Sequence, residues 1–400
     1  MAKVAYQKLE DHSLFFWGLL GLHVFVIVLG LGAAFYMVEW GHVVTGMNNQ
    51  IVWGTPHVFA VFLIVAASGA LNVASFSSVF SRLDYKPYAR LSGILAIALL
   101  VGGLAVLVLD LGRLDRLIVA MTTYNFRSIF AWNIYLYTGF MVLVGAYLFV
   151  MMDRRISRKS WPTKTVGASA FVWRLILTTG TGSIFGFLIA REAYSAAIMA
   201  PFFIAASFLY GLAFTIPVLL MMSRETRQDL INNEMLRKFR GLLIIFSLAV
   251  LYFTAAHHIM KIYAAGYRDV EHFMLLGGGI YTTVFWLGHV LIGNVLPLAI
   301  LFFPSKDRTS WHAIAVASLL FLIGGVANMY VTIIGAQAYP LNLFPGMEVT
   351  STFGDGVVAQ YWPSTPEVLL GISGVSIAML LTGVALKLLP FLPHQHQRQS

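Results

Sequence analysis

Long apolar stretches alternate with short polar segments along the whole chain. A bilayer core about 30 Å thick requires about 20 apolar residues of helix. Lipid offers the backbone no hydrogen-bond partners, so membrane-spanning segments are expected to be helices, and the short alternating strands of a barrel are absent from the sequence. We predict an all-α polytopic membrane protein, a bundle of ten transmembrane helices, at Leu14–Val38, Thr55–Phe80, Ser92–Leu111, Ser128–Met152, Ala168–Ala190, Ala196–Met222, Gly241–Tyr263, Gly277–Phe303, Trp311–Ile334 and Pro366–Leu389.

Composition strengthens this prediction and excludes several site chemistries. Hydrophobic residues make up 59% of the chain and charged residues 11%, whereas about a quarter of the residues of soluble domains are charged. Cysteine is absent, which excludes disulfides, thiolate nucleophiles and thiolate-held zinc or iron–sulfur clusters. We therefore expect no metal bound by this chain, unless histidines ligate a haem.

The net charge of +9 follows from topology. Most of the 26 Lys and Arg residues fall in alternate segments between the predicted spans, the pattern of the positive-inside rule. Both termini are then cytoplasmic, and we expect a lipid membrane and no nucleic acid as the partner of the basic residues. The charged segment 1–13 is atypical of a cleaved signal peptide. Residues 1–400 are expected to form one integral membrane domain, with outer loops 110–127 and 335–365 that dock partners.

Ionisable groups within predicted spans are costly in lipid and so mark candidate sites. His57 follows Trp53 near the outer end of the second span, where a neutral imidazole could donate to a quinone carbonyl and exchange its proton. An interfacial histidine beside a belt aromatic is an equally open interpretation.

The loop before the fourth span holds further candidates. Tyr124 and Asn125 could complete a pocket for the quinone head group, and Arg127 could stabilise an anionic form; the alternative is ordinary interface decoration. Asp110, close to Arg113, is either part of a salt-bridged helix end or a proton-exit group.

Histidines of the seventh and eighth spans suggest either electron or proton transfer. His257 or His258 with His289 could ligate haem b, although adjacent residues on a helix point about 100° apart. The same histidines with Arg174 could relay protons, or could only hydrogen-bond neighbouring helices. A secondary transporter is a further alternative, although no matching halves with broken helices are seen.

Several motifs in order resemble the NrfD/PsrC-like quinone-interacting membrane subunits, in their ten-span HybB-type form. The motifs are Trp53-Gly54 with Ser68-Gly69, Asp110-Leu111-Gly112-Arg113, Asn125 with Trp132, Trp286-Leu287-Gly288-His289 with Gly293 and Pro297, and Tyr361-Trp362-Pro363-Ser364 with Glu367. Within this family the chain is most similar to DsrP-type subunits of the DsrMKJOP complex of dissimilatory sulfur metabolism. Two positions depart from the family pattern: His289 where relatives often carry Glu, and Leu114 where many carry Pro.

The resemblance implies a subunit that exchanges electrons between membrane quinone, menaquinone or ubiquinone, and a periplasmic ferredoxin-like iron–sulfur subunit. It also implies a multihaem cytochrome c and other membrane subunits as partners, in the inner (cytoplasmic) membrane of a bacterium or archaeon. The candidate site residues are, for quinone binding, His57, Tyr124, Asn125, Arg127 and Trp53 and, for proton transfer, Asp110, Arg174, His258 and His289.

Overall fold

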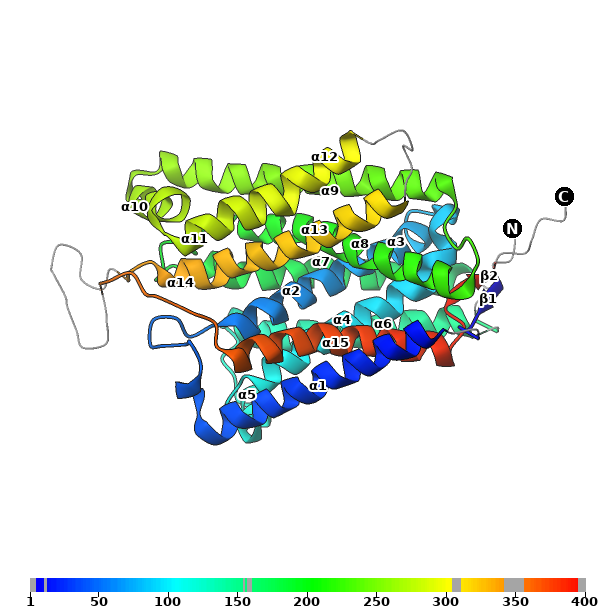
Figure 1. Cartoon of the computed structure of the whole chain (residues 1–400), viewed down its shortest axis with the longest axis horizontal. Helices are drawn as coiled ribbons and strands as arrows, with labels where there is room; N and C mark the ends of the chain where they lie inside the picture. The colour runs from blue at the N-terminus through cyan, green and yellow to red at the C-terminus, as the bar shows by residue number, and fades with distance from the viewer. Residues whose placement is uncertain are drawn as a thin grey trace.

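The computed structural model of the chain describes residues 5–10, 13–153, 155–156, 160–303, 311–341 and 356–394. Within these ranges the regular secondary structure is helical apart from two three-residue strands, β1 (Ala5–Gln7) and β2 (Leu392–His394). The all-α fold class predicted from the hydrophobic pattern is therefore confirmed (Figure 1).

The long helices run roughly parallel or antiparallel to one another (Figure 1). They are α1 (Leu14–Trp40), α2 (Thr55–Ala70), α4 (Ala89–Leu109), α6 (Ile129–Met152), α7 (Ser160–Phe187), α8 (Met199–Thr226), α9 (Asn233–Tyr263), α13 (Trp311–Tyr330) and α15 (Thr365–Leu388).

Shorter helical pieces extend or connect these helices. They are η1 (His42–Val44), α3 (Asn72–Ser78), η2 (Leu83–Tyr88), η3 (Leu114–Arg116), α5 (Leu117–Thr122), η4 (Ala265–Tyr267), α10 (Arg268–His272), α11 (Ile280–Thr283), α12 (Leu296–Phe302), α14 (Ala336–Ala338) and the π-helical η5 (Phe273–Gly277), η6 (Val284–Val295) and η7 (Val331–Gly335).

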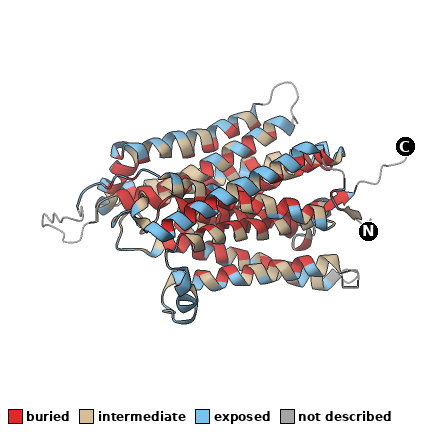
Figure 2. Cartoon of the chain, turned by 60° about the horizontal axis from the view of Figure 1, so that its bottom comes forward, coloured by how far each residue is buried: buried red, intermediate tan, exposed pale blue. Residues whose placement is uncertain are grey.

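Helix α2 lies at the centre of the bundle and packs against α4, α8 and α15. Its most apolar stretch is 94% buried, whereas that of α1, which lies against α15 at the edge, is 17% buried. Buried positions face inward and exposed positions face outward (Figure 2). Many of the exposed side chains are large and apolar, and lipid would cover them. Small residues make the central packing possible: a Cβ on Gly69 of α2 would collide with the backbone carbonyl of Ser207 on α8.

Nine helices in the described ranges are long and apolar enough to cross a membrane. The remaining long helix, α7, carries Lys164, Arg174 and a run of threonine and glycine, although it packs between α6 and α8. The chain is an integral, multi-pass membrane protein. The count of ten spans stays a prediction, as do the domain boundaries.

Three predicted spans are interrupted in the structure, and the ninth passes from α13 into the π-helical η7 at Val331. The second divides into α2 and α3 at Leu71. The eighth is built from α11, η6 and α12, and Pro297, which has no N–H to continue an α-helical ladder, stands in the first turn of α12. Such breaks arise from tertiary packing and local backbone geometry, which hydropathy does not report.

The two ends of the described chain meet at one end of the bundle, because β1 and β2 pair antiparallel. The opposite end, called the distal end here, is where α1 ends, α2 and α15 begin and α4 ends (Figure 1). Residues 342–355 of the predicted docking loop 335–365 lie outside the described residues.

Candidate functional site

The ends of α2 and α4 meet at the distal end and bring two predicted site residues together. Pro56 occupies the first turn of α2, where its missing N–H leaves no bond unmade, and His57 follows it. Asp110 is the C-terminal cap of α4. Because α2 and α4 are antiparallel neighbours, the first turn of one lies beside the last turn of the other.

A buried carboxylate stands between two imidazoles. His57 Nδ1 lies 3.0 Å from Asp110 Oδ2, and His42 Nε2 lies 3.5 Å from Asp110 Oδ1 and 3.0 Å from the Asp110 carbonyl oxygen. The Asp110 side chain is 1% exposed, that of His57 22% and that of His42 36%. The pKa of His42 is raised because its hydrogen bond to the Asp110 carboxylate outweighs the opposing effect of burial. We call these three residues the Asp110 cluster.

The arginine of the salt-bridged helix end considered for Asp110 pairs with another carboxylate in the structure. Arg113 donates through Nε and Nη2 to the carboxylate of Asp115, at 2.9 and 2.8 Å, and both side chains are exposed. Asp110 instead has histidine partners, whose charge depends on their protonation. The arrangement can therefore store or pass a proton.

Trp53 forms an aromatic wall beside this cluster. Its ring stacks on that of His57, with centroids 6.2 Å apart and an interplanar angle of 27°. The same indole contacts Phe130 at the start of α6, and also Phe185 and Tyr194. An aromatic, partly exposed imidazole next to a buried carboxylate suits a planar ligand that gives up or takes a proton.

Buried polar residues hold Trp53 and the start of α2 in place. The Gln337 Oε1 accepts from the N–H groups of Val52 and Trp53, at 3.0 and 3.1 Å, and its Nε2 donates to the Trp53 carbonyl at 3.0 Å. This amide is 1% exposed, so all its bonds are made inside the protein. The backbone of Trp53 is thereby fixed on both sides.

Glu367 and Tyr361 fix the first residue of α2. The Tyr361 hydroxyl donates to Glu367 Oε1 at 2.6 Å and accepts from the Thr55 N–H at 2.7 Å. Glu367 Oε2 accepts from the N–H groups of Gly46 and Ser364, both at 2.8 Å. Burial, reinforced by Glu367, raises the pKa of Tyr361, so the phenol keeps its proton.

The remaining residues predicted to bind quinone lie on a more exposed segment. Tyr124 packs against Phe126 and Tyr135, and the Asn125 Oδ1 accepts from the Arg127 N–H at 3.0 Å. Among the described residues no hydrogen bond, ion pair or ring contact joins these three to the Asp110 cluster. Phe130, on the same stretch of chain, does reach Trp53. Their role in quinone binding stays a prediction.

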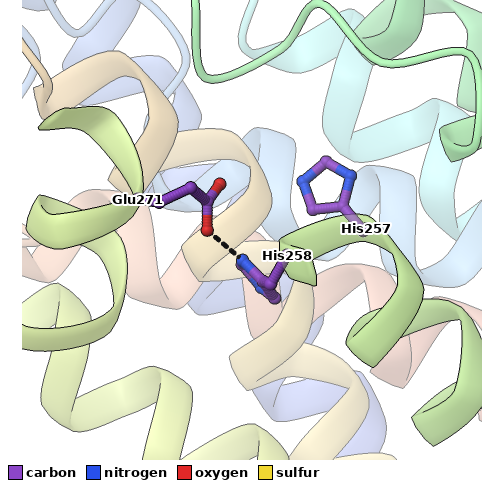
Figure 3. Close-up of side chains that lie close together, drawn as sticks. All are labelled: His257, His258 and Glu271. Carbon is purple, nitrogen blue, oxygen red and sulfur yellow. Dashed lines mark hydrogen bonds and ion pairs between the residues drawn. The ribbon is translucent and has the colours of Figure 1, made fainter. Parts of the chain in front are cut away.

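A second polar group lies between α9, α10 and η6. His258 Nδ1 is 2.6 Å from Glu271 Oε2 (Figure 3), and His289 Nε2 is 3.2 Å from Thr254 Oγ1. The Phe285 ring stands between the two histidines. A cavity of about 50 Å³ borders His257, His258, Thr254 and Tyr194, large enough for a few waters. One ring nitrogen of His258 and one of His289 are engaged by protein groups, with the Phe285 ring between the two imidazoles, an arrangement that suits proton transfer better than joint ligation of a haem.

Arg174 is located elsewhere in the bundle. It is fully buried on α7, donates to the Ser68 carbonyl of α2 at 3.2 Å and lies over the rings of Phe171 and Phe208. Thr178, one turn along, bonds to Ser68 as well. The predicted relay is thus divided: His258 and His289 share one polar group, and Arg174 belongs to another. Its part in proton transfer stays a prediction.

Sequence reasoning missed His42, Gln337 and Glu271 as site residues. His42 is 68 positions from Asp110, and Gln337 is 284 positions from Trp53. A polar residue close to a predicted span end is the one signal that the sequence offers for them. Glu367 was noted within a motif, and its buried hydrogen bonds to Gly46 and Tyr361 became visible only in three dimensions.

Comparison with known proteins places this architecture in a family. The family model described as "Polysulphide reductase, NrfD" matches residues 43–340. The chain is 27% identical over 398 residues to the "Hdr-like menaquinol oxidoreductase integral membrane subunit" of Archaeoglobus fulgidus, covering 98% of both chains. It is also 27% identical to a putative membrane subunit of a dimethyl sulfoxide reductase from Halobacterium salinarum, covering 93% of this chain and 91% of that one.

A third relative, a subunit of the selenate reductase of Mesobacillus selenatarsenatis, is 20% identical over 93% of this chain and 94% of its own length. The family model covers most of this chain, and both polar groups at the distal end contain residues within the matched range. The chain therefore belongs to the polysulphide reductase NrfD family.

Proposed function

We propose that this chain is the quinone-binding membrane subunit of a respiratory electron-transfer complex. The observation that carries the proposal is the His57–Asp110 pair beside the Trp53 ring at the distal end of the bundle. The full-length similarity to a menaquinol oxidoreductase membrane subunit supports it. The substrate is a menaquinone or a ubiquinone drawn from the membrane.

The Asp110 cluster provides the acid–base chemistry. Oxidation of a quinol releases two electrons and two protons, and His57 accepts the two protons one after the other from the quinol hydroxyls, through the ring nitrogen that faces away from Asp110. The Asp110 carboxylate stabilises the resulting imidazolium. His42, more exposed on the other side of the carboxylate, passes the proton to water at the distal surface. Quinone reduction follows the same steps in reverse.

The head group is proposed to lie against the Trp53 and Phe130 rings, which contact each other with centroids 5.6 Å apart and form one apolar wall. Tyr124, Asn125 and Arg127 precede Phe130 in the chain and supply hydrogen-bond donors toward the second carbonyl. The electrons leave to an iron–sulfur subunit docked on the distal surface, because this chain has no cysteine to ligate a cluster. That partner is ferredoxin-like and periplasmic.

The wider setting follows from the same proposal. A multihaem cytochrome c and further membrane subunits complete the complex, which resides in the inner membrane of a bacterium or archaeon. The motif pattern favours a DsrP-type subunit in dissimilatory sulfur metabolism. The positive-inside distribution supports an orientation in which the distal end faces the periplasm.

The test is the His57→Ala variant in the assembled complex, with His312→Ala as a matched control at the other end of the bundle. General acid–base groups contribute typically about 10²- to 10⁴-fold, so quinol-coupled electron transfer should fall at least about 100-fold in the first variant. The control should keep its rate. An unchanged rate in His57→Ala would remove His57 from the site.

A second function, proton movement across the membrane, is favoured by the second polar group. His258 with Glu271 and His289 with Thr254 lie close to a small cavity suited to water. Proteoliposomes that contain the complex should release more protons per quinol than the two that quinol oxidation itself supplies, and His289→Leu should remove this excess while electron transfer persists. Equal proton release by both proteins would contradict a relay through His289.

A further inference from the structure

We propose that His257, His258 and Glu271 form a binding site for a borderline divalent cation of the Zn²⁺ class. One ligand atom from each residue lies within 4.8 Å of the other two. The two histidines come from the end of α9 and the carboxylate from α10 across from it, and the side chains approach a common space (Figure 3).

The distances require a small adjustment. Zinc bonds of about 2.0–2.2 Å place two tetrahedral ligand atoms roughly 3.4 Å apart. His258 Nδ1 and Glu271 Oε2 are 2.6 Å apart and share a proton. A cation would replace that proton, and would thereby compete with proton transfer through His258 and Glu271. It would separate these two atoms by less than 1 Å more, while drawing the His257 ring closer.

His257 supplies an independent observation. Its Nδ1 is buried and has no hydrogen-bond partner in the described part of the chain. A buried polar atom without a partner costs free energy, so it needs an unseen water or ion to satisfy it. The His257 ring lies edge-on to that of His258, with centroids 5.0 Å apart, and one of its ring nitrogens lies within 4.8 Å of the other two ligand atoms.

The neighbouring cavity provides a further coordination position. It is bordered by both His257 and His258 and is large enough for a few waters. Three protein ligands with an adjacent water form the open type of zinc site, in contrast to the closed four-ligand structural type.

The charges around the site select the kind of cation. Glu271 is the one carboxylate among the three ligands. Lys261, one turn beyond His257, is held away by the carbonyls of Glu192 and Ala193, to which its Nζ donates at 2.9 and 2.6 Å. The site has two imidazole ligands and an ammonium group nearby. It therefore favours cations that prefer nitrogen ligands, and it disfavours Mg²⁺ and Ca²⁺, which prefer oxygen ligands.

The experiment is a Co²⁺ titration of the full-length protein in detergent, purified with a tag that contains no histidine and stripped with a chelator. Visible d–d absorption should appear with one Co²⁺ per chain and disappear on addition of Zn²⁺ but not of excess Mg²⁺. Because the readout is an absorption spectrum, it is independent of quinone turnover.

His257→Gln and Glu271→Gln should each weaken Co²⁺ binding at least tenfold, and His312→Ala should leave it unchanged. Thermal unfolding of each variant checks that the fold is kept. If Glu271→Gln does not fold, His257→Gln, at a partly exposed position, is the variant that tests the site. Absence of d–d bands in the unmodified protein, or equal Co²⁺ affinity in the folded variants, would overturn the proposal.

Discussion

At the residue scale, the candidate site depends most on the Asp110 carboxylate. Its side chain is 1% exposed, and its ion-pair contacts are made to His57 and His42. An unpaired buried charge is costly, so the pair of imidazoles compensates for burial of this carboxylate. Removal of either histidine would affect the carboxylate as well as the proton chemistry.

Asp110→Asn tests this carboxylate in the assembled complex. The amide cannot stabilise an imidazolium at His57, so kcat for quinol oxidation should fall about 10²-fold or more. KM should change much less, because the amide keeps the size of the side chain and Trp53 is untouched. Steady-state kinetics over a range of quinol concentrations measures both values. A loss confined to KM would assign Asp110 to binding rather than to proton transfer.

The raised pKa of His42 predicts that the stability of the protein depends on pH. Its folded pKa is raised above the ordinary value of about 6.5, so its contribution is fully present below that value and is lost as the pH rises through the folded pKa. His42→Gln should therefore lower the thermal midpoint at about pH 5.5 and have little effect at about pH 9. Midpoints of both proteins across this range provide the measurement. An equal difference at both pH values would contradict a charged His42–Asp110 pair.

At the element scale, the position of α2 decides where the site forms. The hydrophobic pattern predicts its first residue, Thr55, correctly, because Gly54 and Pro56 mark a helix start in the sequence. Its partners were not predictable. The bonds that fix it come from Tyr361 and Glu367, about 300 positions away, and nothing in local propensity encodes such a pairing.

For the candidate site, too, local features were predictable from the sequence and distant contacts were not. Trp53, His57 and Asp110 were identified from ionisable or aromatic residues at predicted span ends, and the fold brings them together. His42 and Gln337 were missed because each acts through one tertiary contact. The break at Leu71 and the π-helical η6 were missed because a continuous apolar run predicts an unbroken helix.

Gly69 supplies a prediction about helix packing. A Cβ on Gly69 would collide with the Ser207 carbonyl, which is backbone and cannot turn aside. Gly69→Ala should therefore destabilise the bundle by about 1–3 kcal/mol, the usual cost of overpacking. Gly18→Ala on α1, where no atom lies within 4 Å of the added carbon, is the matched control. Thermal unfolding in detergent compares the two, and equal midpoints would show that α2 and α8 can separate without cost.

At the scale of the whole molecule, the two polar groups of the distal end are connected through the segment of residues 191–194. Tyr194 contacts Trp53 of the first site and borders the cavity of the second. On one side Arg191 donates to the carbonyls of Gln337 and Gln50, at 2.9 and 2.8 Å. On the other side Lys261 donates to the carbonyls of Glu192 and Ala193. The segment therefore has fixed contacts to both halves of the bundle.

Arg191→Gln should loosen this connection without removing a group from the Asp110 cluster. Trp53 would lose part of the support that Gln337 gives it, so KM for quinol should rise several-fold with a smaller change in kcat. Arg268→Gln, at an exposed position of α10, is the control. Steady-state kinetics over a range of quinol concentrations measures KM and kcat for both variants. An unchanged KM would show that Trp53 is held by Gln337 alone.

The central claim is that quinone binds at the Asp110 cluster, and photoaffinity labelling of the assembled complex with an azido-quinone tests it most directly. Peptide mapping by mass spectrometry should find the label on the segments that contain Trp53, His57 or Phe130. Excess menaquinone should compete with the label, and His57→Ala should reduce it. Label concentrated on the peptides of α9 and η6, around His258 and His289, would contradict the account and move the quinone site to the second polar group.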